Sequence, residues 1–360
     1  MNVRSTRLGA LMICGALAFC AACMDDDDPP PPGGSMPQQF VEVDEAARAA
    51  FEMMDLSGMG LAVYDGQGEK VFERMYGDFS PDRSVALASA SKLVSGVVIF
   101  RLITQGYLSL DSTTAEVLGW SGEKGTITLR HLLSFTSGLR PEHRCTYQAN
   151  TTLAACVDLI SRTEPLAPPG TRFDYGSTHL HVAGRMAEVA VGTPWNEIFT
   201  KQIAEPLGLA SDAVYYADPL RSRGTTNPLL AGGLRLSMND YAKVLRLVFD
   251  KGKWQGETLV APELFDEQAA TPFPQAVIGR SPAQYHEIRY GLTAWLECST
   301  PASGCATISS PGAFGFLPWL DRATGYYAIL AMEQPFGAAR RVSVPLEQEL
   351  QPLIEHALAE

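Results

Sequence analysis

Strand-like segments lie at both ends of this chain, and the stretch between them consists mostly of short helical segments and loops. Residues 59–65 and 70–76 flank a glycine-containing turn and predict a hairpin. Strand character returns late in the chain, at residues 290–296, 314–320 and 326–332. This order predicts an α/β (α+β) fold of two lobes. One antiparallel sheet would be built from both ends of the chain and flanked by helices, with a mostly helical lobe inserted in the middle.

The predicted α/β lobe comprises residues 38–105 and 285–360, and the helical lobe comprises residues 106–284. Residues 38–360 would thus form a single domain, and a hydrophobic content of 46% with 19% charged residues suits a globular protein. Helical periodicity is clearest at residues 38–54, 178–191, 194–205 and 342–359.

The first 22 residues have the features of a secretory signal peptide. Two arginines precede an apolar or small stretch over residues 8–22, which is too short to span a membrane. Cys23 then follows two alanines, as in a bacterial lipoprotein cleavage box, although Cys20 replaces the usual leucine. We expect lipid attachment to Cys23 on the periplasmic side of a bacterial envelope, the alternative being nearby cleavage without lipid. Residues 23–37, rich in aspartate and proline, would form a tether.

The mature part of the chain contains four cysteines in two sequence-local pairs. In an oxidising compartment this spacing predicts the disulfides Cys145–Cys156 and Cys298–Cys305. The mature part has no C-x-x-C spacing, and two histidines, His179 and His181, would point in different directions on a helix. We therefore expect these histidines to be structural or surface residues rather than ligands, and we expect no metal.

A formal net charge of −12 argues against a nucleic-acid partner, because such proteins need a basic face. The chain also lacks a G-x-S-x-G elbow, an H-E-x-x-H motif, a Walker loop and a G-x-G-x-x-G fingerprint. No cofactor is therefore expected.

The S-x-x-K pattern occurs twice and carries the first chemical signal. Ser121 and Lys124 lie in a polar loop, whereas Ser89 and Lys92 open an apolar helix. Positions i and i+3 share a helix face, so Lys92 would lie beside the Ser89 hydroxyl. Desolvation would lower the lysine pKa and free a neutral amine to act as a base. The alternative is an ordinary helix cap with a solvent-reaching lysine.

Four later segments resemble the serine β-lactamase-like superfamily, which includes class C β-lactamases, D-Ala-D-Ala carboxypeptidases, D-aminopeptidases and family VIII esterases. They occur in the family's order, and the resemblance extends from about residue 59 to residue 315. The segments are RHLLSFTSGL at 130–139, PPGTRFDYGS at 168–177, PLGL at 206–209 and AGGL followed by DYA at 231–242.

This resemblance implies a catalytic role for three residues. Ser89 matches the acylated nucleophile and Lys92 matches the group that takes its proton. Tyr175 matches the tyrosine that shares the base role and protonates the leaving group. The alternative for Tyr175 is a packed aromatic residue with a satisfied hydroxyl.

The resemblance also implies substrate-binding positions, at which this chain departs from the family pattern. Ser177 stands where the family usually has asparagine. The third motif, normally Lys or His followed by a small residue and glycine, is matched best by Ser310, Pro311 and Gly312, so its cation is missing. The alternative for this segment is an ordinary tight turn. Backbone N–H groups of Ser89 and Ala313 would form the oxyanion hole.

Together these features predict an exported serine hydrolase that acts on small ester, amide or peptide substrates. Without the third-motif cation, we expect short-chain esters to be hydrolysed and β-lactams to be hydrolysed weakly or not at all. Arg340 or Arg341 could supply the missing charge, although solvent or acidic neighbours are the expected partners. The alternatives are a β-lactamase, a D-Ala-D-Ala carboxypeptidase, or a catalytically silent penicillin-binding-like sensor of cell-wall peptides.

Overall fold

An antiparallel sheet to which both ends of the chain contribute organises the fold. The computed structural model describes residues 37–218, 220, 224–282, 289–298 and 304–360. Within these ranges seven strands pair in the order β10-β11-β12-β13-β14-β1-β2. Their bounds are Gly58–Asp65 (β1), Lys70–Gly77 (β2), Arg289–Tyr290 (β10), Trp295–Leu296 (β11), Thr307–Ser309 (β12), Leu317–Asp321 (β13) and Tyr326–Ala331 (β14). The predicted antiparallel sheet built from both ends is therefore present.

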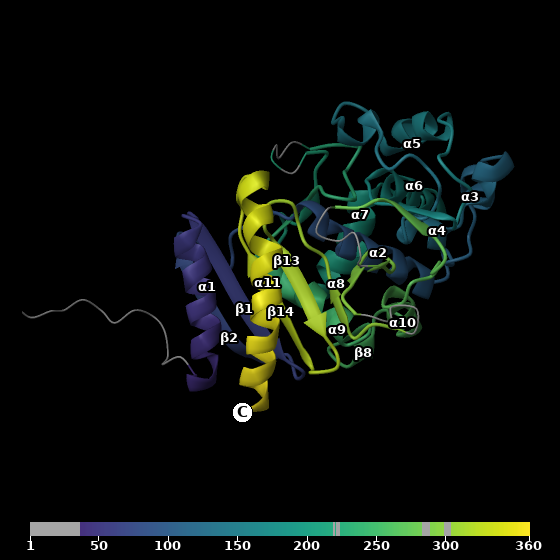
Figure 1. Ribbon diagram of the computed structural model, residues 1–360. Helices are drawn as coiled ribbons and strands as arrows, with labels where there is room; N and C mark the ends of the chain where they lie inside the picture. The colour runs from purple at the N-terminus through teal and green to yellow at the C-terminus, as the bar shows by residue number, and fades with distance from the viewer. Residues whose placement is uncertain (1–36, 219, 221–223, 283–288, 299–303) are drawn as a thin grey trace, which may run out of the picture. The chain divides into compact units, whose positions relative to one another are not determined.

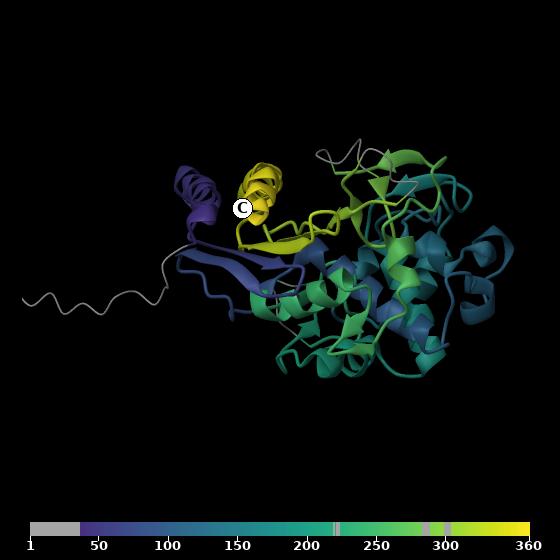
Figure 2. The same ribbon diagram turned by 90° about the horizontal axis from the view of Figure 1, so that it is seen from below.

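The pairing of β1 with β14 joins the two ends of the domain. Gly60 lies opposite Ala331, and Asp65 lies opposite Tyr326. Nearly every residue of these two strands is buried, because helices cover both faces of the sheet. Helices α1 (Val41–Met53) and α11 (Phe336–Ala359) lie side by side on one face, as Figures 1 and 2 show. Helix α9 (Met238–Phe249) packs against β13 and β14.

The intervening stretch is mostly helical, as expected, with short strands added. Its helices are α2 (Ser91–Thr104), α3 (Thr114–Leu118), α4 (Leu129–Leu133), α5 (Leu153–Ser161), α6 (Thr178–Val191), α7 (Trp195–Phe199), α8 (Glu205–Leu207), α9 and α10 (Glu263–Gln268). Its strands are β3 (Val85–Ala86), β4 (Arg172–Asp174), β5 (Val214–Tyr215), β6 (Leu234–Leu236), β7 (Lys253–Trp254), β8 (Glu257–Thr258) and β9 (Val277–Arg280). The predicted segment 194–205 forms α7 and continues as a π-helical turn over 200–204 before α8.

Helix α2 is the central helix of the domain, and most of its residues are buried. A short 3-10 turn, Ala88–Ala90, leads into it, so Ser89 lies just before the regular helix rather than within it. The reason is local: Ala88 has a φ of 45°, a left-handed conformation that interrupts helical geometry. Strain of this kind is often found at functional sites.

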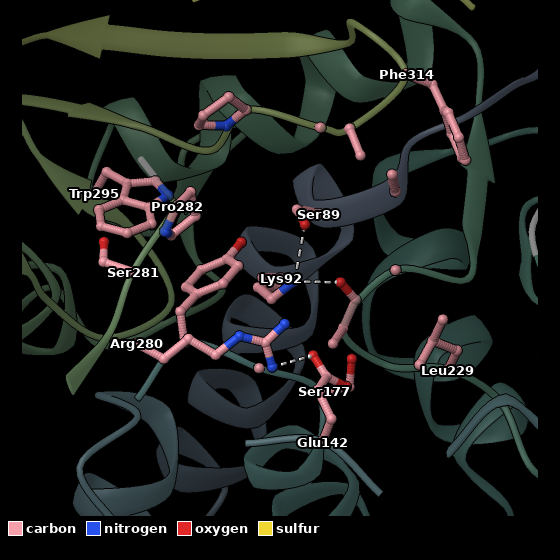
Figure 3. Close-up of a pocket in the computed structure, with 18 of the residues that line it drawn as sticks. Ser89, Lys92, Glu142, Ser177, Leu229, Arg280, Ser281, Pro282, Trp295 and Phe314 are labelled. Carbon is pink, nitrogen blue, oxygen red and sulfur yellow. Dashed lines mark hydrogen bonds and ion pairs between the residues drawn. The ribbon is translucent and has the colours of Figure 1, made fainter. Parts of the chain in front are cut away.

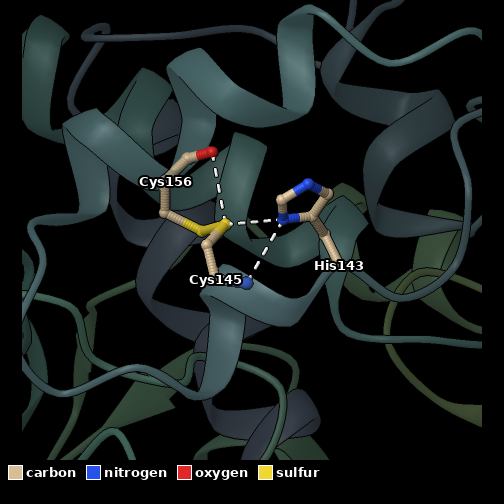
Figure 4. A group of neighbouring side chains, drawn as sticks. All are labelled: His143, Cys145 and Cys156. Atoms are coloured by element: carbon tan, nitrogen blue, oxygen red, sulfur yellow. Dashed lines mark hydrogen bonds between the residues drawn. A yellow bond between two sulfur atoms is a disulfide. The ribbon is translucent and has the colours of Figure 1, made fainter.

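Both predicted cysteine pairings are disulfides in the structure. Cys145 is bonded to Cys156, with 5.3 Å between their Cα atoms, and Cys298 is bonded to Cys305, with 5.8 Å between theirs. Figure 4 shows that the His143 ring lies against the first of these bonds, with Nδ1 3.0 Å from the Cys145 sulfur. Because both sulfurs of this group are in a disulfide, they are not thiolate ligands.

The two histidines predicted not to bind metal lie on α6. His179 and His181 are both buried, and His179 is hydrogen-bonded to the Ser137 hydroxyl and to the Asp174 carbonyl. These contacts give His179 a structural role. Within the described ranges no helix combines the length and the apolar character that crossing a bilayer requires. Cys23 and the rest of the predicted signal and tether lie outside the described residues.

Candidate active site

A cavity of about 770 Å³ opens where the start of α2, the inserted segments and the edge of the sheet meet. Figure 3 shows that Ser89 and Lys92 lie at its centre. The cavity is lined by six of the seven residues predicted to act in catalysis or substrate binding, namely Ser89, Lys92, Tyr175, Ser177, Gly312 and Ala313. Segments from sequence positions 89 to 313 therefore converge on one site.

Lys92 is positioned to act on the Ser89 hydroxyl. Its Nζ lies 3.0 Å from Ser89 Oγ and donates to the Ala231 carbonyl at 2.6 Å. The lysine is only 3% exposed, and its burial lowers the pKa of the amine to about 7, against a smaller opposing effect of Glu142. A large fraction of the amine is therefore neutral at neutral pH and able to accept a proton.

Tyr175 follows β4 and faces the same lysine. Lys92 Nζ lies 4.7 Å from the centre of the Tyr175 ring, which stacks on Trp295 at 5.2 Å. Burial raises the pKa of Tyr175 above its ordinary value, although a hydrogen bond with the Ser89 side chain acts in the opposite direction. Tyr175 therefore keeps its proton at neutral pH, while Lys92 is the group that can accept one.

The segment at 310–313 packs closely against the turn that carries Ser89. A Cβ on Gly312 would approach the Leu87 carbonyl oxygen to 2.2 Å, so only glycine fits at this position. Ala313 lines the cavity, and among the described residues its N–H has no hydrogen-bond acceptor in the chain. The Ala313 N–H is thus available to a ligand.

Ser310 does not line the cavity, which differs from its expected role as a substrate-binding residue. Its hydroxyl is buried and donates to the Ser89 carbonyl at 3.4 Å. The physical reason is the close packing of Gly312 against the Leu87 carbonyl. It holds Ser310, two residues earlier, against the turn that carries Ser89. Ser310 therefore supports the turn from behind.

Three polar residues that the sequence did not single out lie beside Ser177. The Ser177 hydroxyl is 3.1 Å from the Tyr147 hydroxyl, which donates to Glu142 Oε2 at 2.7 Å. The other carboxylate oxygen of Glu142 lies 3.6 Å from Arg280. Figure 3 shows the contact between Glu142 and Arg280 next to Ser177. No motif marks these residues, and only the position of Glu142 and Tyr147 shortly after the 130–139 segment could have suggested them.

Comparison with known proteins identifies the fold family. A family model described as Beta-lactamase matches residues 45–350. The chain belongs to the beta-lactamase family. A Bacteroides dorei protein assigned as a beta-lactamase has a solved structure with a TM-score of 0.77 and 28% identity, covering 89% of this chain and 99% of the other.

Curated relatives of this beta-lactamase-family chain have several activities in their names. The D-alanyl-D-alanine-carboxypeptidase/endopeptidase AmpH of Escherichia coli is 29% identical over 202 residues, or 50% of this chain and 51% of the relative. Esterase EstB of Burkholderia gladioli is 27% identical over 192 residues, or 45% and 48% respectively. The chain thus spans about half the length of each relative. The names of these relatives support hydrolase chemistry but differ in substrate.

Other candidate residues in this beta-lactamase-family protein lie away from the cavity. Lys124 donates to the carbonyls of Ser161 and Thr163, at the end of α5, and Ser121 is exposed. Arg341 is exposed and does not line the cavity, and the side chain of Arg340 lies outside the described residues. Helix α11 instead contributes Ser343 and Val344 to the cavity wall.

Proposed function

We propose that this protein is a serine hydrolase that forms an acyl-enzyme on Ser89 and acts on short-chain esters. The observation that carries the proposal is the contact between Ser89 and Lys92, an amine whose burial lowers its pKa to about 7. A neutral lysine beside a serine hydroxyl can act as the base that activates the hydroxyl as a nucleophile.

The geometry supports a division of labour in the proposed reaction. As Ser89 Oγ attacks the acyl carbon, the neutral Lys92 amine accepts the hydroxyl proton. Tyr175, which keeps its proton, donates it to the leaving group and regains a proton from the Lys92 ammonium. Backbone N–H groups of Ser89 and Ala313 stabilise the oxyanion. Water then attacks the acyl-enzyme, with the same groups moving protons in reverse.

The preference for esters follows from the third-motif segment. Substrates such as β-lactams and D-Ala termini carry a carboxylate, which a lysine or histidine at this motif would bind by a charge-assisted hydrogen bond. Here the position is Ser310, whose hydroxyl is turned toward the Ser89 carbonyl instead of the cavity. The acylation machinery itself needs no such cation, so esters without a carboxylate at this position remain suitable.

A comparison of substrates tests the proposal. We expect a higher kcat/KM for p-nitrophenyl butyrate than for a chromogenic cephalosporin or a D-Ala-D-Ala peptide. A fluorophosphonate should label Ser89, and Ser89→Ala should abolish both labelling and turnover. Efficient cephalosporin or peptide turnover with negligible ester turnover would contradict the ester preference. Absence of labelling and turnover would favour a silent penicillin-binding-like protein.

We also propose that the protein is exported and held on a bacterial membrane through lipid on Cys23. The signal-like residues 1–22 and the tether at 23–37 support this, and two disulfide-bonded cysteine pairs suit an oxidising compartment. Cys23→Ser should move the protein from the membrane fraction to the soluble fraction. A wild-type protein already in the soluble fraction after cell lysis would contradict the anchoring.

A further inference from the structure

The cavity wall around Ser177 contains a charged pair that the proposed reaction does not use. Glu142 and Arg280 line the cavity with side chains that are 32% and 56% exposed. Among the described residues that line the cavity, Lys92 and Arg280 are the only lysine and arginine. The rest of the lining is mixed: Leu229, Pro282 and Phe314 are apolar, and a second acidic residue, Asp218, also lines the cavity.

The backbone of Arg280 is anchored to the segment that carries Tyr175. The Arg280 carbonyl accepts a hydrogen bond from the Tyr175 N–H at 2.8 Å, and the Arg280 N–H donates to Asp174 at 2.9 Å. Asp174 is itself buried and also accepts from the Arg172 side chain. The base of the Arg280 side chain is therefore held at a fixed place beside the catalytic tyrosine.

The guanidinium of Arg280 is only loosely engaged. Its contact with Glu142 is 3.6 Å long, beyond ordinary hydrogen-bond distance, and no other side-chain hydrogen bond of Arg280 occurs within the described residues. Glu142 already accepts a hydrogen bond from Tyr147 at 2.7 Å. Hydrogen-bond donors of Arg280 are thus available to an anion in the cavity, and Glu142 would retain a partner.

The direction of Arg280 indicates which part of a substrate could reach it. Figure 3 shows its guanidinium turned toward Glu142 and Ser177 and away from Trp295. Tyr175 stacks on Trp295, and the leaving group must approach the Tyr175 hydroxyl to receive its proton. With the leaving group beside Tyr175 and Trp295, an acyl group can extend along the wall that holds Ser177 and Arg280.

We propose that Arg280 forms a subsite for a carboxylate carried on the acyl group of the substrate, which takes the place of Glu142 beside the guanidinium. The favoured substrates would be half-esters of short dicarboxylic acids or acyl donors of similar charge. This inference rests on the proposed ester hydrolysis at Ser89 and specifies its acyl group. Anion binding here differs from the third-motif position, because Arg280 lies on another wall of the cavity.

A pair of matched esters tests the subsite directly. Mono-p-nitrophenyl glutarate and p-nitrophenyl valerate have the same acyl length and leaving group and differ by a terminal carboxylate in place of a methyl. We expect the wild type to prefer the glutarate in kcat/KM. Arg280→Gln should lower the ratio of glutarate to valerate by about tenfold, because a charge-assisted contact is lost. Glu142→Gln should raise the ratio, because a competing anion is removed.

Two controls make the outcome unambiguous. Arg162→Gln removes the same charge from an exposed pair with Asp158 outside the cavity and should leave both substrates unaffected. For a quaternary ammonium ester, p-nitrophenyl 4-(trimethylammonio)butanoate, we expect a low kcat/KM with the wild type and a higher kcat/KM with Arg280→Gln. If both esters are cleaved through Ser89 but the ratio is near one and insensitive to Arg280, the subsite is refuted while the proposed function stands. If neither ester is cleaved, the proposed function itself fails.

Discussion

Lys92 makes the pH dependence of the proposed hydrolysis predictable at the scale of a single residue. In the proposed mechanism the neutral amine is the required form and its pKa is about 7, so kcat/KM for p-nitrophenyl butyrate should rise through an acid limb near pH 7. Glu142 raises the pKa of Lys92, so Glu142→Gln should move this limb to lower pH. The exposed Glu164 lies away from the cavity, and Glu164→Gln serves as the matched control. A limb that stays in place in Glu142→Gln would contradict the electrostatic coupling.

Substitutions at the catalytic residues should separate the two S-x-x-K sites. Ser89→Ala and Lys92→Ala should each lower kcat by about a thousandfold or more, because removing one member of a catalytic unit costs nearly as much activity as removing all of them. Tyr175→Phe should follow closely, because the proton donor is lost. Ser121→Ala and Lys124→Ala should retain activity. Melting temperatures recorded alongside the rates would show that the inactive variants are folded. Full activity in Ser89→Ala would overturn the assignment.

At the scale of elements, the sequence predicts best where a pattern is local. The hairpin of β1 and β2, helix α6 and the closing helix have periodic apolar residues or a glycine turn within a few positions. β12 has three residues, and β9 pairs in parallel with β4 about a hundred residues earlier, so no local pattern marks them. Arg280 lies on β9, which is why the charged wall of the cavity could not be predicted while the S-x-x-K helix could.

Helix α11 carries a buried carboxyl group whose charge should affect stability. Glu347 is 1% exposed, and burial and the neighbouring Glu297 raise its pKa well above the ordinary value. Gln351 donates hydrogen bonds to both carboxyl groups. When an acid has a higher pKa in the folded state than in the unfolded state, its protonation stabilises the fold. This contribution is complete below the unfolded-state pKa and is lost as the pH rises through the folded-state pKa.

Glu347→Gln should therefore stabilise the protein at alkaline pH. We expect its melting temperature to exceed that of the wild type by about 2 °C or more at pH 8, with a smaller or reversed difference at pH 5. Calorimetry at both pH values measures this. The same shift at both pH values would show that packing, not protonation, is responsible.

For the whole molecule, the disulfides should contribute to stability and to the shape of the cavity. Cys145 and Tyr147 share one 3-10 turn, so the Cys145–Cys156 bond also anchors the Tyr147 and Glu142 side of the site. A double variant, Cys145→Ser with Cys156→Ser, should lose about 2–3 kcal/mol of unfolding free energy in urea. The matched change at Cys298 and Cys305 serves for comparison. A wild-type protein with four free thiols in non-reducing peptide mapping would refute both bonds.

The site also has a consequence for the timing of biosynthesis. Ser89 leaves the ribosome early, but the turn that carries it is packed against Gly312, and strand β1 is paired with β14 near the other end of the chain. A nascent chain can thus display the serine for more than two hundred residues of synthesis without the segment that completes its surroundings. Acylation competence should therefore appear only when translation is nearly finished.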